Sequence, residues 1–195
     1  MIKEIVKDNV LERLNSIEKE LSENIDIKKN RELLMEHDSI INYYGGGKER
    51  YSTALEFIKM KGLERVFDIG CGYGFQSELF INSGINYVGI DGSVRENQFF
   101  NKDKATYLSK VYPFDIEAKN TDLALSVLCL TWNCYLFNGA ETYKQQMEQL
   151  SRDFKHVILY MNKADLNFVK SYFKGYESIE GTREYFNSKF YYFYN

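Results

Sequence analysis

The hydrophobic residues of this chain follow two different periodicities. Up to residue 62, apolar side chains recur every three or four positions, which is typical of amphipathic helices. The first stripe comprises Ile2, Val6, Val10, Leu14, Ile17 and Leu21. Further stripes span 33–44 and 51–58, with Gly45-Gly46-Gly47 between them, and Gly62 suits the end of the last helix. Residues 1–62 are therefore predicted to form an N-terminal helical extension.

After residue 62, short apolar runs alternate with segments of helical periodicity. Strands are predicted over 66–69, 87–90, 111–114, 123–130, 156–160, 176–180 and 190–194. Helices are predicted over 75–83, from 93 onward, and over 140–152 and 165–173. This alternation is typical of an α/β fold with a doubly wound, mostly parallel sheet. The last two strands are close in sequence and are expected to pair antiparallel, so 63–195 is predicted to be one seven-stranded domain.

A glycine-rich turn follows the first predicted strand. Residues 68–74 read Asp-Ile-Gly-Cys-Gly-Tyr-Gly, with glycine at every second position. Glycine lacks the Cβ atom that would keep a ligand away from the backbone. The second strand ends at Asp91, about 20 residues further on, where ribose-binding folds place a hydroxyl acceptor. Since the carboxyl ends of parallel strands share one edge of the sheet, these features predict a site for a nucleoside-containing ligand.

These motifs resemble those of a known enzyme family. The segment 68–74 resembles the first motif of class I S-adenosylmethionine-dependent methyltransferases, an acid followed by G-x-G-x-G. Asp91 resembles the family's ribose-binding acid, and Asp115 stands where the family often has an acid near the adenine amino group. The segment 120–126 resembles its fourth strand. The resemblance covers roughly residues 50–195 and implies a Rossmann-like fold, S-adenosylmethionine as cofactor, and methyl transfer.

The chemistry of this methyl donor suggests a role for each motif. The N–H groups of the glycine turn and the helix that follows favour its carboxylate. Asp68 would attract its ammonium group, directly or through water, and Asp91 would accept the ribose hydroxyls. Asp115, or a nearby backbone group, would read the adenine amine. The cofactor-binding residues predicted in this domain are Asp68, Gly70, Cys71, Gly72, Gly74, Asp91 and Asp115.

The N-terminal helices are expected to form a lid over the donor. Residues 38–44 resemble a D-x-x-x-x-x-Y segment that many small-molecule methyltransferases place there. Tyr44, or Tyr43, would face the sulfonium in a cation–π contact of roughly 0.5–2 kcal/mol. The three glycines at 45–47 act either as a hinge of this lid or as a plain linker. No catalytic residue is assigned, because a base is needed only if the acceptor must lose a proton.

The acceptor is predicted to be a small molecule. Residues 131–134, Thr-Trp-Asn-Cys, should face it, and they lack the N-P-P-Y-type sequence of enzymes that methylate amino groups of nucleic acids. A net charge of −3 favours neither nucleic acid nor an anionic membrane. The alternatives are an RNA or protein methyltransferase, a non-catalytic binding module, and a nicotinamide dehydrogenase. The dehydrogenase pattern G-x-G-x-x-G fits poorly, because Phe75 takes the position of its third glycine.

Cysteine and histidine usage bears on compartment and metal binding. The three cysteines, Cys71, Cys129 and Cys134, form no C-x-x-C pair and are expected to be free thiols in a reducing cytoplasm. No metal-ligand spacing is present, and His156 is interpreted as structural. No signal peptide or membrane span is expected. The aromatic run 190–194 fits either a strand packed on both faces or an edge that meets a partner, which leaves a homodimer open.

Overall fold

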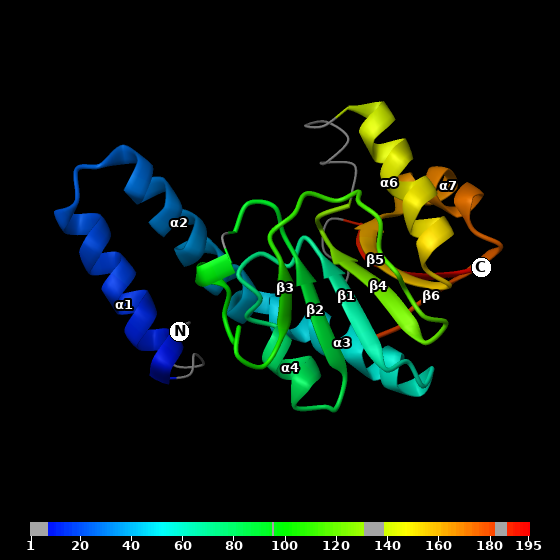
Figure 1. The fold of residues 1–195 in the computed structure, drawn as a ribbon, viewed down its shortest axis with the longest axis horizontal. Helices are drawn as coiled ribbons and strands as arrows, with labels where there is room; N and C mark the ends of the chain where they lie inside the picture. The colour runs from blue at the N-terminus through cyan, green and yellow to red at the C-terminus, as the bar shows by residue number, and fades with distance from the viewer. Residues whose placement is uncertain (1–7, 95, 131–138, 182–186) are drawn as a thin grey trace. The chain divides into compact units, whose positions relative to one another are not determined.

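The computed structural model describes residues 8–94, 96–130, 139–181 and 187–195. The chain divides into two compact units, Met1–Tyr51 and Ser52–Asn195, and each is described by itself (Figure 1). Helix α3 (Lys48–Met60) crosses the boundary between them. Most of α3 therefore belongs with the sheet rather than with the helices that precede it.

The N-terminal unit is built on a helical hairpin of α1 (Asp8–Glu23) and α2 (Ile27–Asn42), as the apolar stripes predict. The buried side chains of these helices are Val10, Leu14, Ile17, Leu33 and Ile40. Asp26 caps α2 by accepting hydrogen bonds from the N–H groups of Lys28 and Lys29. A π-helical turn, η2 (Tyr43–Gly47), follows α2, and within it Gly46 has a non-helical φ of +144°. The chain therefore bends within the triple-glycine segment.

The second unit contains a seven-stranded sheet in the order β3-β2-β1-β4-β5-β7-β6. The strands are β1 (Arg65–Ile69), β2 (Asn86–Ile90), β3 (Thr106–Leu108), β4 (Asp122–Val127), β5 (His156–Asn162), β6 (Gly175–Ser178) and β7 (Ser188–Tyr194). Strands β1 to β5 are parallel, whereas β7 runs antiparallel to both of its neighbours. The predicted mostly parallel sheet with an antiparallel end is confirmed.

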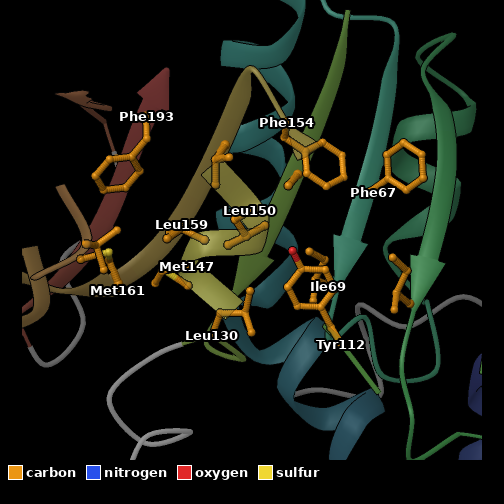
Figure 2. Packing of buried hydrophobic residues seen from close by; sticks show 14 of the residues in the cluster. Phe67, Ile69, Tyr112, Leu130, Met147, Leu150, Phe154, Leu159, Met161 and Phe193 are labelled. Atoms are coloured by element: carbon orange, nitrogen blue, oxygen red, sulfur yellow. The ribbon is translucent and has the colours of Figure 1, made fainter. Parts of the chain in front are cut away.

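Helices cover both faces of this sheet, as expected for a doubly wound fold (Figure 1). On one face lie α3 and α4 (Ser77–Ile81): the rings of Phe57 and Tyr192 are 5.0 Å apart, and those of Phe80 and Tyr87 are 5.6 Å apart. On the other face lie α6 (Ala140–Asp153) and α7 (Leu166–Val169), and Figure 2 shows Met147 and Leu150 of α6 beside Leu159 of β5. Burial on both faces explains the nearly continuous apolar runs of the central strands.

The third strand lies five residues earlier than predicted. The prediction of a strand over 111–114 is wrong, because β3 spans Thr106–Leu108. Tyr107 stacks on Phe99 at 4.3 Å between ring centroids and donates a hydrogen bond to the Phe100 carbonyl oxygen at 2.6 Å, which anchors this edge strand. Pro113 lacks an N–H group for a strand ladder. The Tyr112 side chain lies in the hydrophobic core but not in a strand.

Three other predicted boundaries also shift. Strand β4 ends at Val127 rather than 130, because Leu128 adopts a positive φ of 65°. The helix predicted from 93 is reduced to a short 3-10 turn, η3 (Glu96–Gln98). The helix predicted over 165–173 is divided into η4 (Lys163–Asp165), α7 and η5 (Lys170–Tyr172). These changes move the boundaries of elements, while the sheet topology stays as predicted.

The aromatic run 190–194 is an interior strand. Strand β7 lies between β5 and β6, so its backbone groups pair on both sides. Of the two sequence-based interpretations of this run, the one that holds is a strand packed on both faces. A homodimer formed through this strand's edge is excluded, and a homodimer of another kind stays a prediction.

Candidate functional site

The glycine turn is bonded to the end of the neighbouring strand β2. Gly70, Gly72 and Gly74 all have positive φ, at 79°, 56° and 76°, a conformation that side chains with a Cβ rarely adopt. The N–H groups of Gly70 and Cys71 donate to the Ile90 carbonyl oxygen at 2.8 and 3.2 Å, and that of Gly72 donates to Asp91 Oδ2 at 2.9 Å. The two-residue glycine spacing therefore folds the turn back on β2.

Four N–H groups of the turn already donate hydrogen bonds within the protein. Besides the three bonds to Ile90 and Asp91, the N–H of Gly74 donates to the Cys71 carbonyl oxygen at 3.1 Å. In this conformation these four groups do not form the open cradle for a ligand carboxylate that the sequence suggests. A ligand carboxylate would have to exchange with one of these bonds or bind beside them.

Two of the glycines are required by packing against protein atoms. A Cβ on Gly70 would lie 2.1 Å from the Cβ of Cys129, in the segment after β4, and one on Gly74 would lie 2.4 Å from the hydroxyl oxygen of Tyr107 on β3. Real Cβ atoms do not approach other atoms this closely. Close approach to a ligand is thus not the first reason for these glycines; they let β3 and the segment after β4 close on the turn.

Asp68 is a fully buried carboxylate, and none of the described residues places a cation beside it. Its Oδ2 accepts hydrogen bonds from Gln76 Nε2 at 2.5 Å and from the Tyr87 hydroxyl at 2.7 Å. Its Oδ1 has no hydrogen-bond partner in the part of the chain that the structure describes. Burial, and to a lesser degree the nearby charge of Asp91, raises the pKa of Asp68 to about 6, against the opposing effect of the two hydrogen bonds. A positively charged ligand group would complement this carboxylate.

Asp91 joins the end of β2 to the glycine turn. Its Oδ2 accepts the Gly72 N–H, while Oδ1 accepts both the N–H of Ser93 at 2.8 Å and the hydroxyl of Ser93 at 2.6 Å. These bonds hold Ser93 in the turn that follows β2. A carboxylate oxygen can accept two hydrogen bonds. Oδ2 of this half-buried residue thus keeps capacity for one hydroxyl of a ligand.

A cavity of about 120 Å³ adjoins Asp91 at the carboxyl ends of β1, β2 and β4. Its wall is formed by Ile69, Gly70, Ile90, Asp91, Gly92, Lys110, Val111, Tyr112, Cys129, Leu130 and Gln146. Pockets that enclose a whole drug-sized ligand measure about 300–1,000 Å³. This cavity therefore has room for one moiety of a nucleoside-containing ligand, with the rest of the ligand outside it.

Asp115 does not line this cavity, although it was predicted to contact the adenine amine. The Asp115 carboxylate is fully exposed and lies 3.4 Å from Arg152 Nη2, at the last turn of α6. Strand β3 ends at Leu108, so the segment that leaves its carboxyl end is 109–112, and Lys110, Val111 and Tyr112 line the cavity instead. Asp115 was predicted to follow the third strand directly. Because β3 ends at Leu108, Asp115 lies seven residues beyond the end of the strand.

Three parts of the predicted site are still to be located: Cys71, Tyr44 and the segment 131–134. The Cys71 side chain is buried, and burial raises its pKa well above the usual range of a thiol. Tyr44 lies in the N-terminal unit, with its ring 5.0 Å from that of Tyr43, so its place over the donor stays a prediction. The segment 131–134, predicted to face the acceptor, lies outside the described residues.

Several residues of the site were missed by sequence reasoning. Gln76 and Tyr87 hold Asp68, while Cys129 and Gln146 line the cavity. Gln146 could have been found, because it interrupts the apolar stripe of α6, whose other buried members are Tyr143, Met147 and Leu150. A polar residue in an otherwise apolar stripe is an informative exception. The partners of Asp68 lie 8 and 19 residues further along the chain, and no local pattern marks them.

His156 belongs to the framework, in agreement with its interpretation as structural. It begins β5, at the end of the strand opposite to the cavity. Its Nδ1 lies 2.6 Å from the hydroxyl oxygen of Tyr192, and burial lowers its pKa. In the described part of the chain, no three His, Cys, Asp or Glu residues are grouped to hold a metal ion. None of the described helices has the length and apolar character needed to cross a membrane.

This chain is similar to known proteins in structure but not in sequence. No protein-family model and no curated protein matches the sequence. Among solved structures, magnesium protoporphyrin IX methyltransferase (ChlM) from Synechocystis PCC 6803, with bound SAM, is 12% identical with a TM-score of 0.55, over 80% of this chain and 84% of its own. The 16S rRNA methylase RmtB is 18% identical with a TM-score of 0.55, over 94% of this chain and 75% of its own.

A third similar structure belongs to a longer protein. WbdD, a bifunctional kinase-methyltransferase, is 18% identical with a TM-score of 0.53, over 76% of this chain. The match spans only 38% of the WbdD chain. At these low identities the likeness concerns the fold: the second unit has the Rossmann-like fold of class I S-adenosylmethionine-dependent methyltransferases.

Proposed function

We propose that this protein is an S-adenosylmethionine-dependent methyltransferase. The observation that carries the proposal is the Asp91 carboxylate, fixed by Gly72 of the glycine turn and placed beside a cavity at the carboxyl ends of the strands. The sheet order supports it, because the dinucleotide-binding fold has the order 3-2-1-4-5-6 without an antiparallel strand between the last two. This difference argues against the nicotinamide dehydrogenase alternative.

The residues present fit the methyl donor by their chemistry. Asp68 offers an uncompensated buried carboxylate to the ammonium group, and Asp91 offers acceptor capacity to a ribose hydroxyl. When bound, S-adenosylmethionine supplies a methyl group that is already activated by the sulfonium. The task of this chain is then to hold and orient the donor, and orientation alone lowers a barrier by up to about 7–11 kcal/mol. No residue of the chain is assigned as a base.

Calorimetry with S-adenosylmethionine and S-adenosylhomocysteine tests the proposal. Asp91→Ala should raise the Kd of both ligands at least tenfold, about 1.4 kcal/mol. Asp103→Ala is the matched control, because this aspartate is exposed on the turn before β3 and should leave both affinities unchanged. If neither ligand binds to folded wild-type protein, the methyltransferase proposal is wrong and the non-catalytic binding module becomes the better explanation.

We propose further that Tyr44 contacts the sulfonium of the donor. A cation–π contact discriminates by charge, so Tyr44→Leu should weaken S-adenosylmethionine binding while sparing the uncharged thioether S-adenosylhomocysteine. The expected loss is about 0.5–2 kcal/mol, and Tyr44→Phe, which keeps the ring, should retain the affinity. An equal effect of Tyr44→Leu on both ligands would argue against the contact.

For the acceptor we propose a small molecule, with RNA as the second candidate. The net charge of −3 supports the small molecule. One observation supports RNA: the match to RmtB covers 94% of this chain, so it takes in helices of the N-terminal unit as well. Radiolabelled donor, incubated with the protein and either purified RNA or a low-molecular-weight metabolite fraction, separates the two. Label in the metabolite fraction alone is the expected result.

We also place the protein in the cytoplasm. Cys71 and Cys129 are free thiols, which suits a reducing compartment. Fractionation of the native host, followed by detection of the protein in the soluble or the membrane and exported fractions, tests this placement.

A further inference from the structure

Gln146 holds a polar group in a position where packing alone would favour an apolar one. It lies on α6 among the core side chains Tyr143, Met147 and Leu150, and it is 5% exposed. A buried polar atom without a hydrogen-bond partner costs about 1–3 kcal/mol. Leucine or methionine would fit this stripe at no such cost, so the glutamine calls for an explanation other than stability.

The two ends of the Gln146 carboxamide differ in their hydrogen bonding to the described residues. Nε2 donates a hydrogen bond to the Tyr112 carbonyl oxygen at 3.2 Å. Because a carbonyl oxygen can only accept, this bond fixes which end of the amide is the nitrogen. Oε1 has no hydrogen-bond partner in the described part of the chain. The segment after β3 thus orients the side chain, and Oε1 can accept a hydrogen bond from a ligand.

The cavity that Gln146 lines has the character of a site for an aromatic base. Ile90, Val111 and Leu130 contribute apolar walls, and Asp91 lies in the same wall. Gly92 lets these walls come together, because a Cβ there would lie 2.3 Å from Cγ2 of Val111. A ribose held at Asp91 would direct its attached base toward this space. The base would then meet apolar surfaces on its faces and the carboxamide of Gln146 at one edge.

We propose that Gln146 determines specificity for an amino-substituted purine, with Oε1 accepting a hydrogen bond from the exocyclic amino group. This inference rests on the proposed function and adds a residue outside the glycine turn and the strand ends. An oxo group in place of the amine would put two acceptors face to face. A site that hydrogen-bonds a ligand group rejects the analogue that lacks it, because the buried partner is then unpaired. Gln146 takes the role that sequence reasoning assigned to Asp115.

The test compares S-adenosylhomocysteine with its deaminated analogue S-inosylhomocysteine, which carries the oxo base. Wild-type protein should bind the adenosyl compound at least tenfold more tightly. Gln146→Leu should weaken the adenosyl compound and bring the two affinities to within about threefold of each other. Gln149→Leu is the matched control on the same helix: Gln149 bonds Asp153 at 3.1 Å and does not line the cavity, so this variant should keep the wild-type preference.

Each outcome decides a separate point. Equal binding of both compounds to wild-type protein overturns the inference without any variant, so a misfolded Gln146→Leu does not leave the question open. A Gln146→Leu protein that is folded and keeps the full preference also overturns it, because the glutamine then only supports the Tyr112 segment. If wild-type protein binds neither compound, the proposed function itself fails. Loss of preference in Gln146→Leu alone is the expected result.

Discussion

Two carboxylates are buried on neighbouring parallel strands, and their surroundings differ in one respect. Asp122, at the start of β4, forms an ion pair with Arg65 of β1 and accepts the N–H of Lys119 at 2.6 Å. Asp68, near the end of β1, accepts hydrogen bonds from the neutral groups of Gln76 and Tyr87. The first carboxylate has its countercharge in the fold, whereas the second has none among the residues that the structure describes.

We take this difference to mean that Asp122 is a structural group, and we propose that Asp68 serves a ligand. A buried ion is costly unless a partner compensates it. Arg65 compensates the charge of Asp122 whether or not a ligand is bound. This pair lies at the amino-terminal ends of β1 and β4, whereas the cavity lies at their carboxyl ends. No cation among the described residues compensates Asp68. Under the proposed function, the ammonium group of the donor would be its countercharge. The same substitution at the two positions should therefore have opposite effects on stability.

The largest effect is expected from Asp122→Asn. It leaves the guanidinium of Arg65, about a quarter exposed, without its countercharge. Removing one partner of a buried pair costs about 3–5 kcal/mol, and partial exposure of Arg65 places the loss near 3 kcal/mol. Urea unfolding of the ligand-free protein measures this loss. A change below 1 kcal/mol, on the order of a surface pair, would remove the contrast between the two carboxylates.

Asp68→Asn should have the opposite sign, with a gain of about 2–3 kcal/mol at pH 8. Because the folded-state pKa is raised from 3.8 to about 6, the unfolded chain ionises first as pH rises, and stability is lost between these values. The loss is complete above pH 6. The gain from the substitution should therefore shrink toward zero near pH 4, which urea unfolding at both pH values checks. A destabilised variant at pH 8 would show that the hydrogen bonds outweigh the burial of charge.

Binding of the donor should cause Asp68 to release a proton. Near pH 6 Asp68 is about half ionised, and an ammonium group beside it drives ionisation to completion, so roughly half a proton leaves. Calorimetry at pH 6 in two buffers of different ionisation enthalpy measures this release. Asp68→Asn should abolish the release and weaken S-adenosylhomocysteine about tenfold, or 1.4 kcal/mol. A release that persists in the variant would assign the proton to another group.

The sequence predicts the fold well because the fold depends on periodic patterns. Apolar runs such as 123–130 mark strands buried on both faces, and the short connection before 190–194 marks the antiparallel pair. The third strand was missed because an edge strand of three residues has too short a pattern to detect. Its position depends on the stacking of Tyr107 against Phe99, a tertiary contact. The resulting shift also displaced the predicted role of Asp115.

The candidate site was predicted in part, and the division has a physical basis. Asp68, the glycines and Asp91 sit at strand ends, where topology brings them together, and the Gly72–Asp91 hydrogen bond joins them. The raised pKa of Asp68 and the unpaired Oε1 of Gln146 depend on the lack of a cation and of a hydrogen-bond donor, respectively, among the described residues around them. Such absences are properties of the packed interior, and no spacing in the sequence encodes them.

The smallest effect is expected from Asp115→Asn, which extends the comparison to an exposed carboxylate. Asp115 is fully exposed, and solvent screens its contact with Arg152. The substitution should leave the urea midpoint unchanged, in contrast to Asp122→Asn and Asp68→Asn, and should leave the affinity for S-adenosylhomocysteine within twofold of wild type. A tenfold loss of affinity would instead show that Asp115 reaches the donor in the bound protein. In that case the amino group of the base would have its acceptor there, and Gln146 would lose the role proposed for it.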